Sequence, residues 1–118
     1  PKDTYALNYV SYKLALRGEE LEYAFKLIKK AVSLEPENGY FLDTIGWVEF
    51  KRKNFKNAVF YLEKATSILP NSVEVLDHLG DCYFKLGRKK EAIYQWKRAG
   101  EGDSASNTAG GVDAAIDQ

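Results

Sequence analysis

Residues 42–70, LDTIGWVEFKRKNFKNAVFYLEKATSILP, decide the fold, because their small and large apolar residues recur at a spacing of 34 positions. Gly46 recurs as Gly80, and Pro70 has its counterpart in Pro36. Three further series keep the same spacing: Ala24, Ala58 and Ala92; Ala31, Ala65 and Ala99; Ile28, Leu62 and Trp96. A fixed period of this length is typical of a solenoid built from one repeated supersecondary unit.

Three units fit this period, at about residues 5–38, 39–72 and 73–106, and each reads as two amphipathic helices. Asn38 and either Asn71 or Ser72 are suited to begin helices as N-caps. Gly18 and Gly87 are placed to end the first helix of their units in a left-handed conformation. We therefore expect an all-α array of about six antiparallel helices over residues 1–102, followed by a flexible acidic tail over 103–118.

Small residues at fixed positions indicate how the helices pack. Alanine at 24, 58 and 92 and glycine at 46 and 80 allow two backbones to approach closely. Large side chains, among them Leu62 and Trp96, are then expected to fill the remaining space.

These positions resemble the tetratricopeptide repeat (TPR) family, whose unit is a 34-residue helix–turn–helix. The resemblance covers about residues 4–102, and its narrower form is to bacterial multi-repeat TPR proteins, including envelope lipoproteins that act as adaptors. It implies a right-handed superhelical solenoid that presents a binding surface. The first unit departs from the pattern, since Tyr12 occupies the glycine position and Asn8 the first large apolar position.

The resemblance also implies a concave groove, lined by the first helix of each unit, that binds a peptide of a partner protein. Aromatic residues would occupy its middle and acidic residues its C-terminal end, which suits a partner with basic or aromatic side chains. Tyr40 and Trp47, on a face expected to lie outside the core, are the expected anchors. The predicted partner-binding residues are Tyr9, Lys13, Tyr40, Asp43, Thr44, Trp47, Asp77, His78 and Asp81.

A known TPR groove clamps the C-terminal carboxylate of chaperone tails with two Lys, two Asn and an Arg. The corresponding positions hold Tyr9, Lys13, Thr44, Glu74 and His78. Only one cation remains and Glu74 would repel a carboxylate, so this mode of binding is disfavoured.

No constellation of catalytic residues emerges, and we expect no enzymatic activity, no small-molecule substrate and no cofactor. His78 with Asp77 and Asp81 invites a zinc site, but no second histidine and no pair of cysteines supports it, so no metal is expected. Cys82, the single cysteine, falls on the packing side of its helix and is predicted to be a buried structural thiol.

Two alternative functions stay open: binding of nucleic acid or an acidic partner through a basic edge, and self-association. All 17 basic and 13 of the 17 acidic residues lie in residues 1–100, which carry +4, while the whole chain is neutral. The turns inside the units form a basic ridge: Arg17, Lys51, Arg52, Lys53, Lys56, Lys85, Arg88, Lys89 and Lys90. The zero net charge disfavours nucleic acid as its partner. The second alternative is self-association (a homo-oligomer) through an uncovered last helix, with Ile93, Tyr94 and Trp96 on its outer face.

The compartment stays open between cytoplasm and periplasm. No apolar run approaches the length needed to span a membrane, and no signal peptide is visible. Methionine is absent, so we expect a mature or excised piece from which a targeting segment could have been removed.

Overall fold

The computed structural model describes residues 3–104, which form six α-helices and no strand. Their bounds are α1 (Thr4–Arg17), α2 (Leu21–Leu34), α3 (Gly39–Lys51), α4 (Phe55–Ile68), α5 (Val73–Lys85) and α6 (Lys89–Ser104). The predicted all-α array of paired helices is confirmed. The helix α6 continues to Ser104, and the predicted acidic tail lies, from residue 105 onward, outside the described residues.

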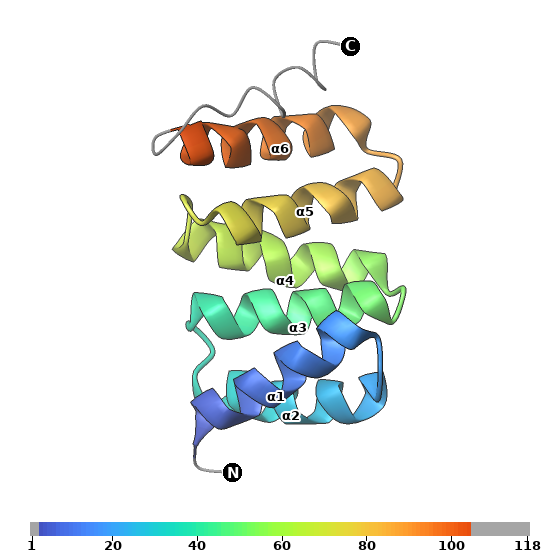
Figure 1. Cartoon of the computed structure of the whole chain (residues 1–118), viewed down its shortest axis with the longest axis vertical. Helices are drawn as coiled ribbons and strands as arrows, with labels where there is room; N and C mark the ends of the chain where they lie inside the picture. Colours follow the sequence, from blue (N-terminus) through green and yellow to red (C-terminus); the bar gives the residue numbers. More distant parts are fainter. Residues whose placement is uncertain (1–2, 105–118) are drawn as a thin grey trace.

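The helices α3 to α6 follow one another along the long axis of the molecule, and α1 and α2 lie together at its other end, where α1 crosses over α2 (Figure 1). Within each unit the two helices pack against each other, as α1 with α2, α3 with α4, and α5 with α6. The first helices of the units also meet, because α3 contacts both α1 and α5. The helix α3 is consequently enclosed, and every residue from Phe41 to Glu49 is buried.

Capping residues begin and end these helices where the sequence predicts. Asn38 Oδ1 accepts hydrogen bonds from the backbone N–H of Tyr40 at 3.0 Å and of Phe41 at 3.2 Å. Ser72 Oγ accepts from the N–H of Val75 at the start of α5. Gly18 and Gly87 have φ values of 68° and 78°, a left-handed conformation that costs glycine little.

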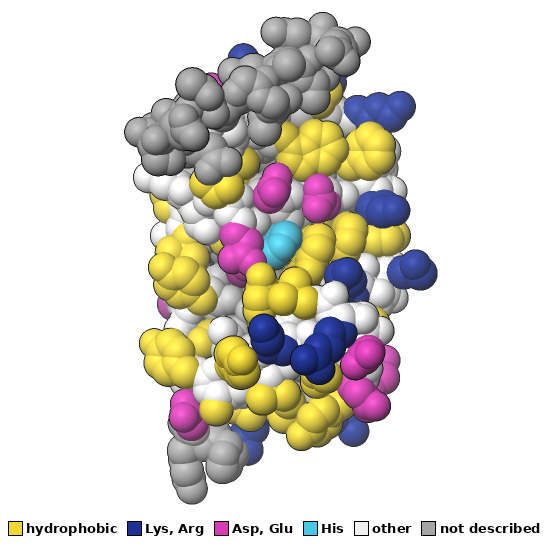
Figure 2. All heavy atoms as spheres, in the orientation of Figure 1, with side chains coloured by type: hydrophobic (Ala, Val, Ile, Leu, Met, Phe, Trp, Pro, Cys, Tyr) yellow, Lys and Arg dark blue, Asp and Glu magenta, His cyan; other side chains and the backbone are white. Residues whose placement is uncertain are grey.

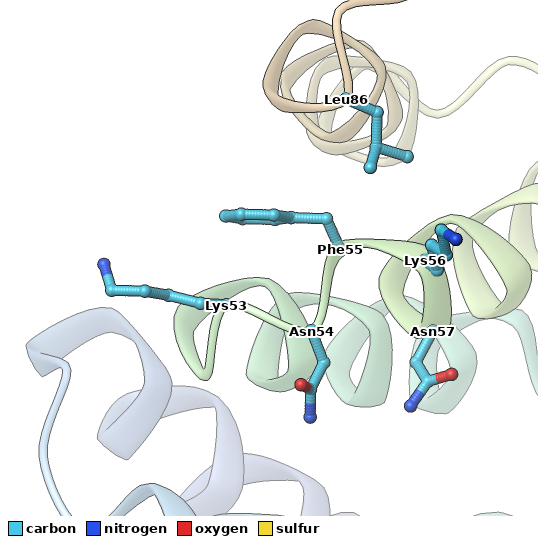
Figure 3. Close-up of a pocket in the computed structure, with 6 residues that line it drawn as sticks. All are labelled: Lys53, Asn54, Phe55, Lys56, Asn57 and Leu86. Carbon is cyan, nitrogen blue, oxygen red and sulfur yellow. The ribbon is translucent and has the colours of Figure 1, made fainter.

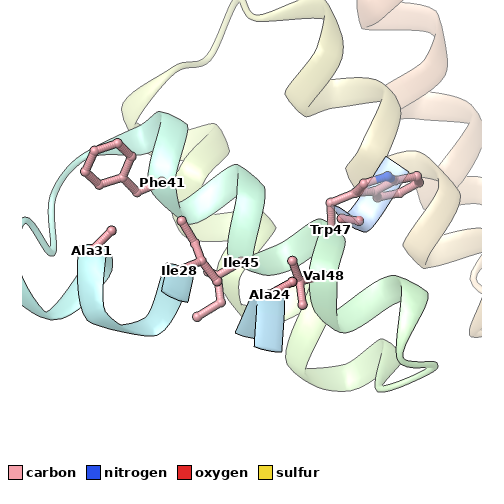
Figure 4. Packing of buried hydrophobic residues seen from close by; sticks show 8 residues of the cluster. Ala24, Ile28, Ala31, Phe41, Ile45, Trp47 and Val48 are labelled. Carbon is pink, nitrogen blue, oxygen red and sulfur yellow. The ribbon is translucent and has the colours of Figure 1, made fainter. Parts of the chain in front are cut away.

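The core is built from the alanine and large apolar series. In Figure 4, Ala24, Ile28 and Ala31 of α2 face the side chains of α3, and all three are fully buried. A Cβ built on Gly46 would lie 2.6 Å from Leu62 Cγ, and one built on Gly80 only 2.5 Å from Trp96 Cδ1. The predicted close approach of helices at these two glycines is confirmed.

One expectation about α6 is wrong. Trp96 does not lie on an outer face, because its ring packs over Gly80 and its Nε1 donates to Asp81 Oδ1 at 3.1 Å. Ile93 and Tyr94 do remain exposed on this helix, at 38% and 60%. Among the helices of residues 3–104, none has both the length and the apolar character required to cross a bilayer.

Candidate functional site

A small pocket opens where the first helices of all three units meet, and we call it the three-helix pocket. Its volume is about 140 Å³. It is lined by Asn8 and Tyr12 of α1, Tyr40, Asp43 and Thr44 of α3, and Glu74 of α5. Each unit of the array therefore contributes at least one polar side chain to one site.

Helical spacing places these side chains together. Tyr40, Asp43 and Thr44 stand at positions i, i+3 and i+4 of α3, and Asn8 and Tyr12 at i and i+4 of α1, so each set shares a face. The Asn38 cap fixes where α3 begins and with it which residues face the pocket.

Asp43 and His78 form a buried pair beside the pocket. Asp43 Oδ1 lies 2.9 Å from His78 Nδ1, and the residues are 5% and 9% exposed. Burial raises the pKa of the Asp43 carboxyl, against the opposing effect of its hydrogen bond to His78. Figure 2 shows acidic side chains gathered around the single histidine of the chain.

A second carboxylate is positioned by a tyrosine. The Tyr12 hydroxyl donates a hydrogen bond to Glu74 Oε2, across 62 residues of sequence. Burial, reinforced by this bond and the negative charge of Glu74, raises the pKa of Tyr12 to about 12. Tyr12 thus stays protonated at neutral pH and remains a donor to Glu74.

One polar atom at the pocket lacks a partner. Asn8 Oδ1 is fully buried and accepts no hydrogen bond from the part of the chain that the structure describes. Leaving a buried acceptor unpaired costs about 1–3 kcal/mol. The residue that carries this unpaired acceptor also lines the pocket, together with Asp43 and Glu74.

Three of the predicted partner-binding residues have exposed side chains. Tyr9 and Tyr40 are 62% and 64% exposed, and they lie on α1 and α3. Lys13 is also exposed, with its Nζ 5.7 Å from the centroid of the Tyr9 ring.

The expectation that Trp47 lies on an open face is wrong. Its ring is buried between two others, stacked on His78 at a centroid distance of 3.9 Å and on Phe50 at 4.3 Å. Thr44 is buried too, at 3% exposed, although it lines the pocket. Trp47 is a core residue here, and a peptide cannot reach it without moving its neighbours.

Asp77 and Asp81 follow on α5 but do not line the three-helix pocket. Asp77 is exposed. Asp81 is half-buried and accepts from Trp96 Nε1, and burial raises the pKa of its carboxyl. Of the acidic residues on α5, Glu74 therefore lines the pocket, whereas Asp77 and Asp81 lie outside it.

Three pocket residues, Asn8, Tyr12 and Glu74, were not among the predicted partner-binding residues. Asn8 and Tyr12 did give a signal in the sequence, since they are the positions at which the first unit departs from its repeat pattern. In the structure both Asn8 and Tyr12 line the three-helix pocket.

The residues that could together hold a metal ion differ from those that the sequence suggested. Asp43, Glu74 and His78 each place one such atom within 4.8 Å of the other two, whereas the sequence pattern paired His78 with Asp77 and Asp81. Cys82 is buried, as predicted, and burial raises the pKa of its thiol to about 12, which makes it a poor nucleophile.

The predicted basic ridge contains a shallow hollow near the α3–α4 turn. It is lined by Lys53, Asn54, Phe55, Lys56, Asn57 and Leu86, whose arrangement Figure 3 shows. Arg52 and Arg88 of the ridge are engaged within the chain, with Glu22, Glu49 and Glu91. These ion pairs reduce the positive charge that the ridge presents.

Comparison with known sequences gives one family match and one curated relative. The family model described as "Anaphase-promoting complex, cyclosome, subunit 3" matches residues 51–109. The "TPR repeat-containing protein PA4667" of Pseudomonas aeruginosa is 36% identical over 62 residues, which are 52% of this chain. The match covers only 10% of the length of that relative.

Solved structures share the fold at low sequence identity. The TPR domain of Sgt2 from Aspergillus fumigatus has a TM-score of 0.79 at 20% identity, covering 88% of this chain and 68% of its own. PcrH, solved in complex with the chaperone binding region of PopB, has a TM-score of 0.81 at 14% identity, covering 97% and 94%. A MamA mutant has a TM-score of 0.74 at 20% identity, covering 86% and 74%.

Proposed function

Because the chain belongs to the tetratricopeptide repeat family, we propose that it is a non-enzymatic module that binds a peptide segment of a partner protein along α1, α3 and α5. The observation that carries the proposal is the combination of the exposed Tyr9 and Tyr40 with a polar pocket on the same helices. Exposed aromatic side chains beside a pocket are favourable anchors, since they bury a large area at small cost in conformational entropy.

The structural neighbours support an interaction role of this general kind. PcrH was solved with a region of PopB bound to it, on the same fold. For this chain the site of contact is our inference from its own residues, chiefly the exposed Tyr9 and Tyr40 and the pocket on the same helices.

The proposal predicts that a peptide selected on this chain depends on Tyr9 and Tyr40. Peptides would be selected from a displayed random library against the full chain, and their affinities measured by fluorescence anisotropy. We expect Tyr40→Ala and Tyr9→Ala each to weaken binding about tenfold, corresponding to about 1.4 kcal/mol.

Phe60→Ala is the matched control, because Phe60 is 66% exposed but lies on α4, which contributes nothing to the pocket. This variant should bind within about twofold of the parent chain. Circular dichroism would show that all three variants keep their helices. Equal losses in the three variants, or none, would mean that peptides bind elsewhere.

Self-association is a second candidate, favoured by the exposed Ile93 and Tyr94 on α6. Apolar side chains on a terminal helix of a repeat array form a surface on which a second copy could stack. Light scattering over a wide concentration range tests this. A mass that stays at one chain throughout would count against it.

A further inference from the structure

We infer that the three-helix pocket binds the guanidinium group of an arginine side chain carried by the partner, an inference that rests on the peptide-binding function proposed above. The pocket presents an excess of hydrogen-bond acceptors. These are the carboxylates of Asp43 and Glu74; Asn8, whose buried Oδ1 has no partner among the described residues, also lines the pocket. A ligand that complements them must bring several donors.

The charge of the site points to a cation. Asp43 and Glu74 both line the pocket, and Asp43 Oδ1 faces His78 Nδ1 at 2.9 Å. The hydroxyl of Tyr12 is already donated to Glu74 and stays protonated, so it adds no negative charge. The nearby Lys13 is directed over the Tyr9 ring and is not among the lining residues.

Size and shape favour one arginine head group. The volume of about 140 Å³ equals roughly four or five water molecules at about 30 Å³ each, enough for one side-chain head. Tyr12 and Tyr40 supply aromatic walls, on which a planar guanidinium can stack. Its five N–H donors can reach several acceptors at once, whereas a lysine ammonium offers a single point charge with three.

A metal ion would use the site less well. One of its candidate ligands, His78, already faces Asp43 Oδ1 through Nδ1 at 2.9 Å. A metal ion would also leave the aromatic walls and much of the pocket unused. An organic cation can engage the two carboxylates and the two tyrosine rings together.

The test uses three blocked pentapeptides that differ only at the central residue, Gly-Gly-Xaa-Gly-Gly with arginine, lysine or citrulline. Citrulline keeps the size and planarity of arginine but carries no charge, so it is the matched control. Each peptide is titrated into the isotopically labelled full chain, and the side-chain amide resonance of Asn8 is followed by NMR.

We expect the arginine peptide to shift this resonance with an affinity about tenfold above that of citrulline and several-fold above that of lysine. Glu74→Gln should reduce arginine binding at least about fivefold while still accepting the Tyr12 hydrogen bond. Glu19→Gln removes one exposed charge from the turn after α1 and should change affinity less than about twofold.

Several results would overturn the inference. Equal binding of arginine and citrulline peptides would show that charge is not read, and equal binding of lysine would remove the preference for guanidinium. Zn²⁺ that shifts the Asn8 resonance when the arginine peptide does not would assign the site to a metal. If selected peptides still depend on Tyr9 and Tyr40 in any of these cases, the peptide-binding proposal survives and only the arginine pocket falls.

Discussion

Whether replacing Gly46 with alanine raises or lowers the free energy of unfolding should depend on one neighbouring side chain, Leu62. The new Cβ would lie 2.6 Å from Leu62 Cγ and 3.1 Å from Leu62 Cδ2. Both distances are shorter than van der Waals contact, and Leu62 is fully buried in the core. Either the leucine or the α3–α4 spacing must therefore move.

Two effects of known size compete in this substitution. Overpacking a close-packed core costs about 1–3 kcal/mol, while exchanging glycine for alanine inside a helix gains about 1 kcal/mol. Gly46→Ala should thus destabilise the parent chain by up to about 2 kcal/mol. Leu62→Ala removes the three atoms nearest to the new Cβ, so in that background the helix gain of about 1 kcal/mol should remain.

The four proteins of this double-mutant cycle would be unfolded in urea and followed by circular dichroism at constant temperature. We expect a coupling energy of about 1–3 kcal/mol between the two positions. Leu62→Ala itself should cost about 2–5 kcal/mol, and a parallel cycle at Gly80 and Trp96 covers the case in which it leaves no folded baseline. If Gly46→Ala stabilises both backgrounds equally, the argument from close packing is refuted.

Two further predictions concern buried charges. Because burial raises the pKa of Asp43, ionisation of its carboxyl opposes folding. The protonated carboxyl stabilises the folded state below its ordinary pKa of about 4. This contribution to stability is lost as the pH rises through the raised pKa of the folded state. Asp43→Asn keeps an acceptor for His78, so urea unfolding should depend less on pH above about 4 than in the parent, and an unchanged dependence would contradict this. Arg52→Met removes the cationic partner of Glu49, whose side chain is 4% exposed. Among the described residues, the side-chain amides of Asn54 and Asn57 then remain as its partners, so the free energy of unfolding should fall by about 1–3 kcal/mol. Glu22→Gln, at a side chain 78% exposed, should lower the free energy of unfolding by less than about 0.5 kcal/mol. If thermal unfolding shows a larger loss for Glu22→Gln than for Arg52→Met, the pair of Arg52 and Glu49 is not stabilising.

The architecture was readable from the sequence because its determinants are local and repeated. Gly46 and Gly80 mark the places where helices touch, and Asn38 and Ser72 begin helices by bonding to backbone N–H groups within three residues. Such features need no knowledge of distant contacts. The bounds of the helices follow from them.

The candidate site was less predictable, and Trp47 shows why. Periodicity assigns it to the groove side of α3, but it does not say how closely the neighbouring helices approach that side. His78 of α5 and Phe50 of α3 cover its ring, so a residue predicted to be open is buried. Conversely, Asn8 and Tyr12 looked like irregularities of a weak first unit, and only the contact of α1 with α3 brings them to one pocket.

The two tryptophans of the chain lie in different units, and this gives the molecule two built-in optical reporters. Trp47 belongs to the middle unit and stacks on His78 of the last one, while Trp96 is held at the α5–α6 contact inside the last unit by Asp81. In a repeat array most contacts join neighbouring units, and here only α1 also reaches the third unit directly, through Tyr12 and Glu74, among the described residues, so the last unit can loosen before the centre does. Fluorescence of variants that retain a single tryptophan, Trp47→Phe and Trp96→Phe, would therefore show whether the last unit melts together with the middle one or separately from it.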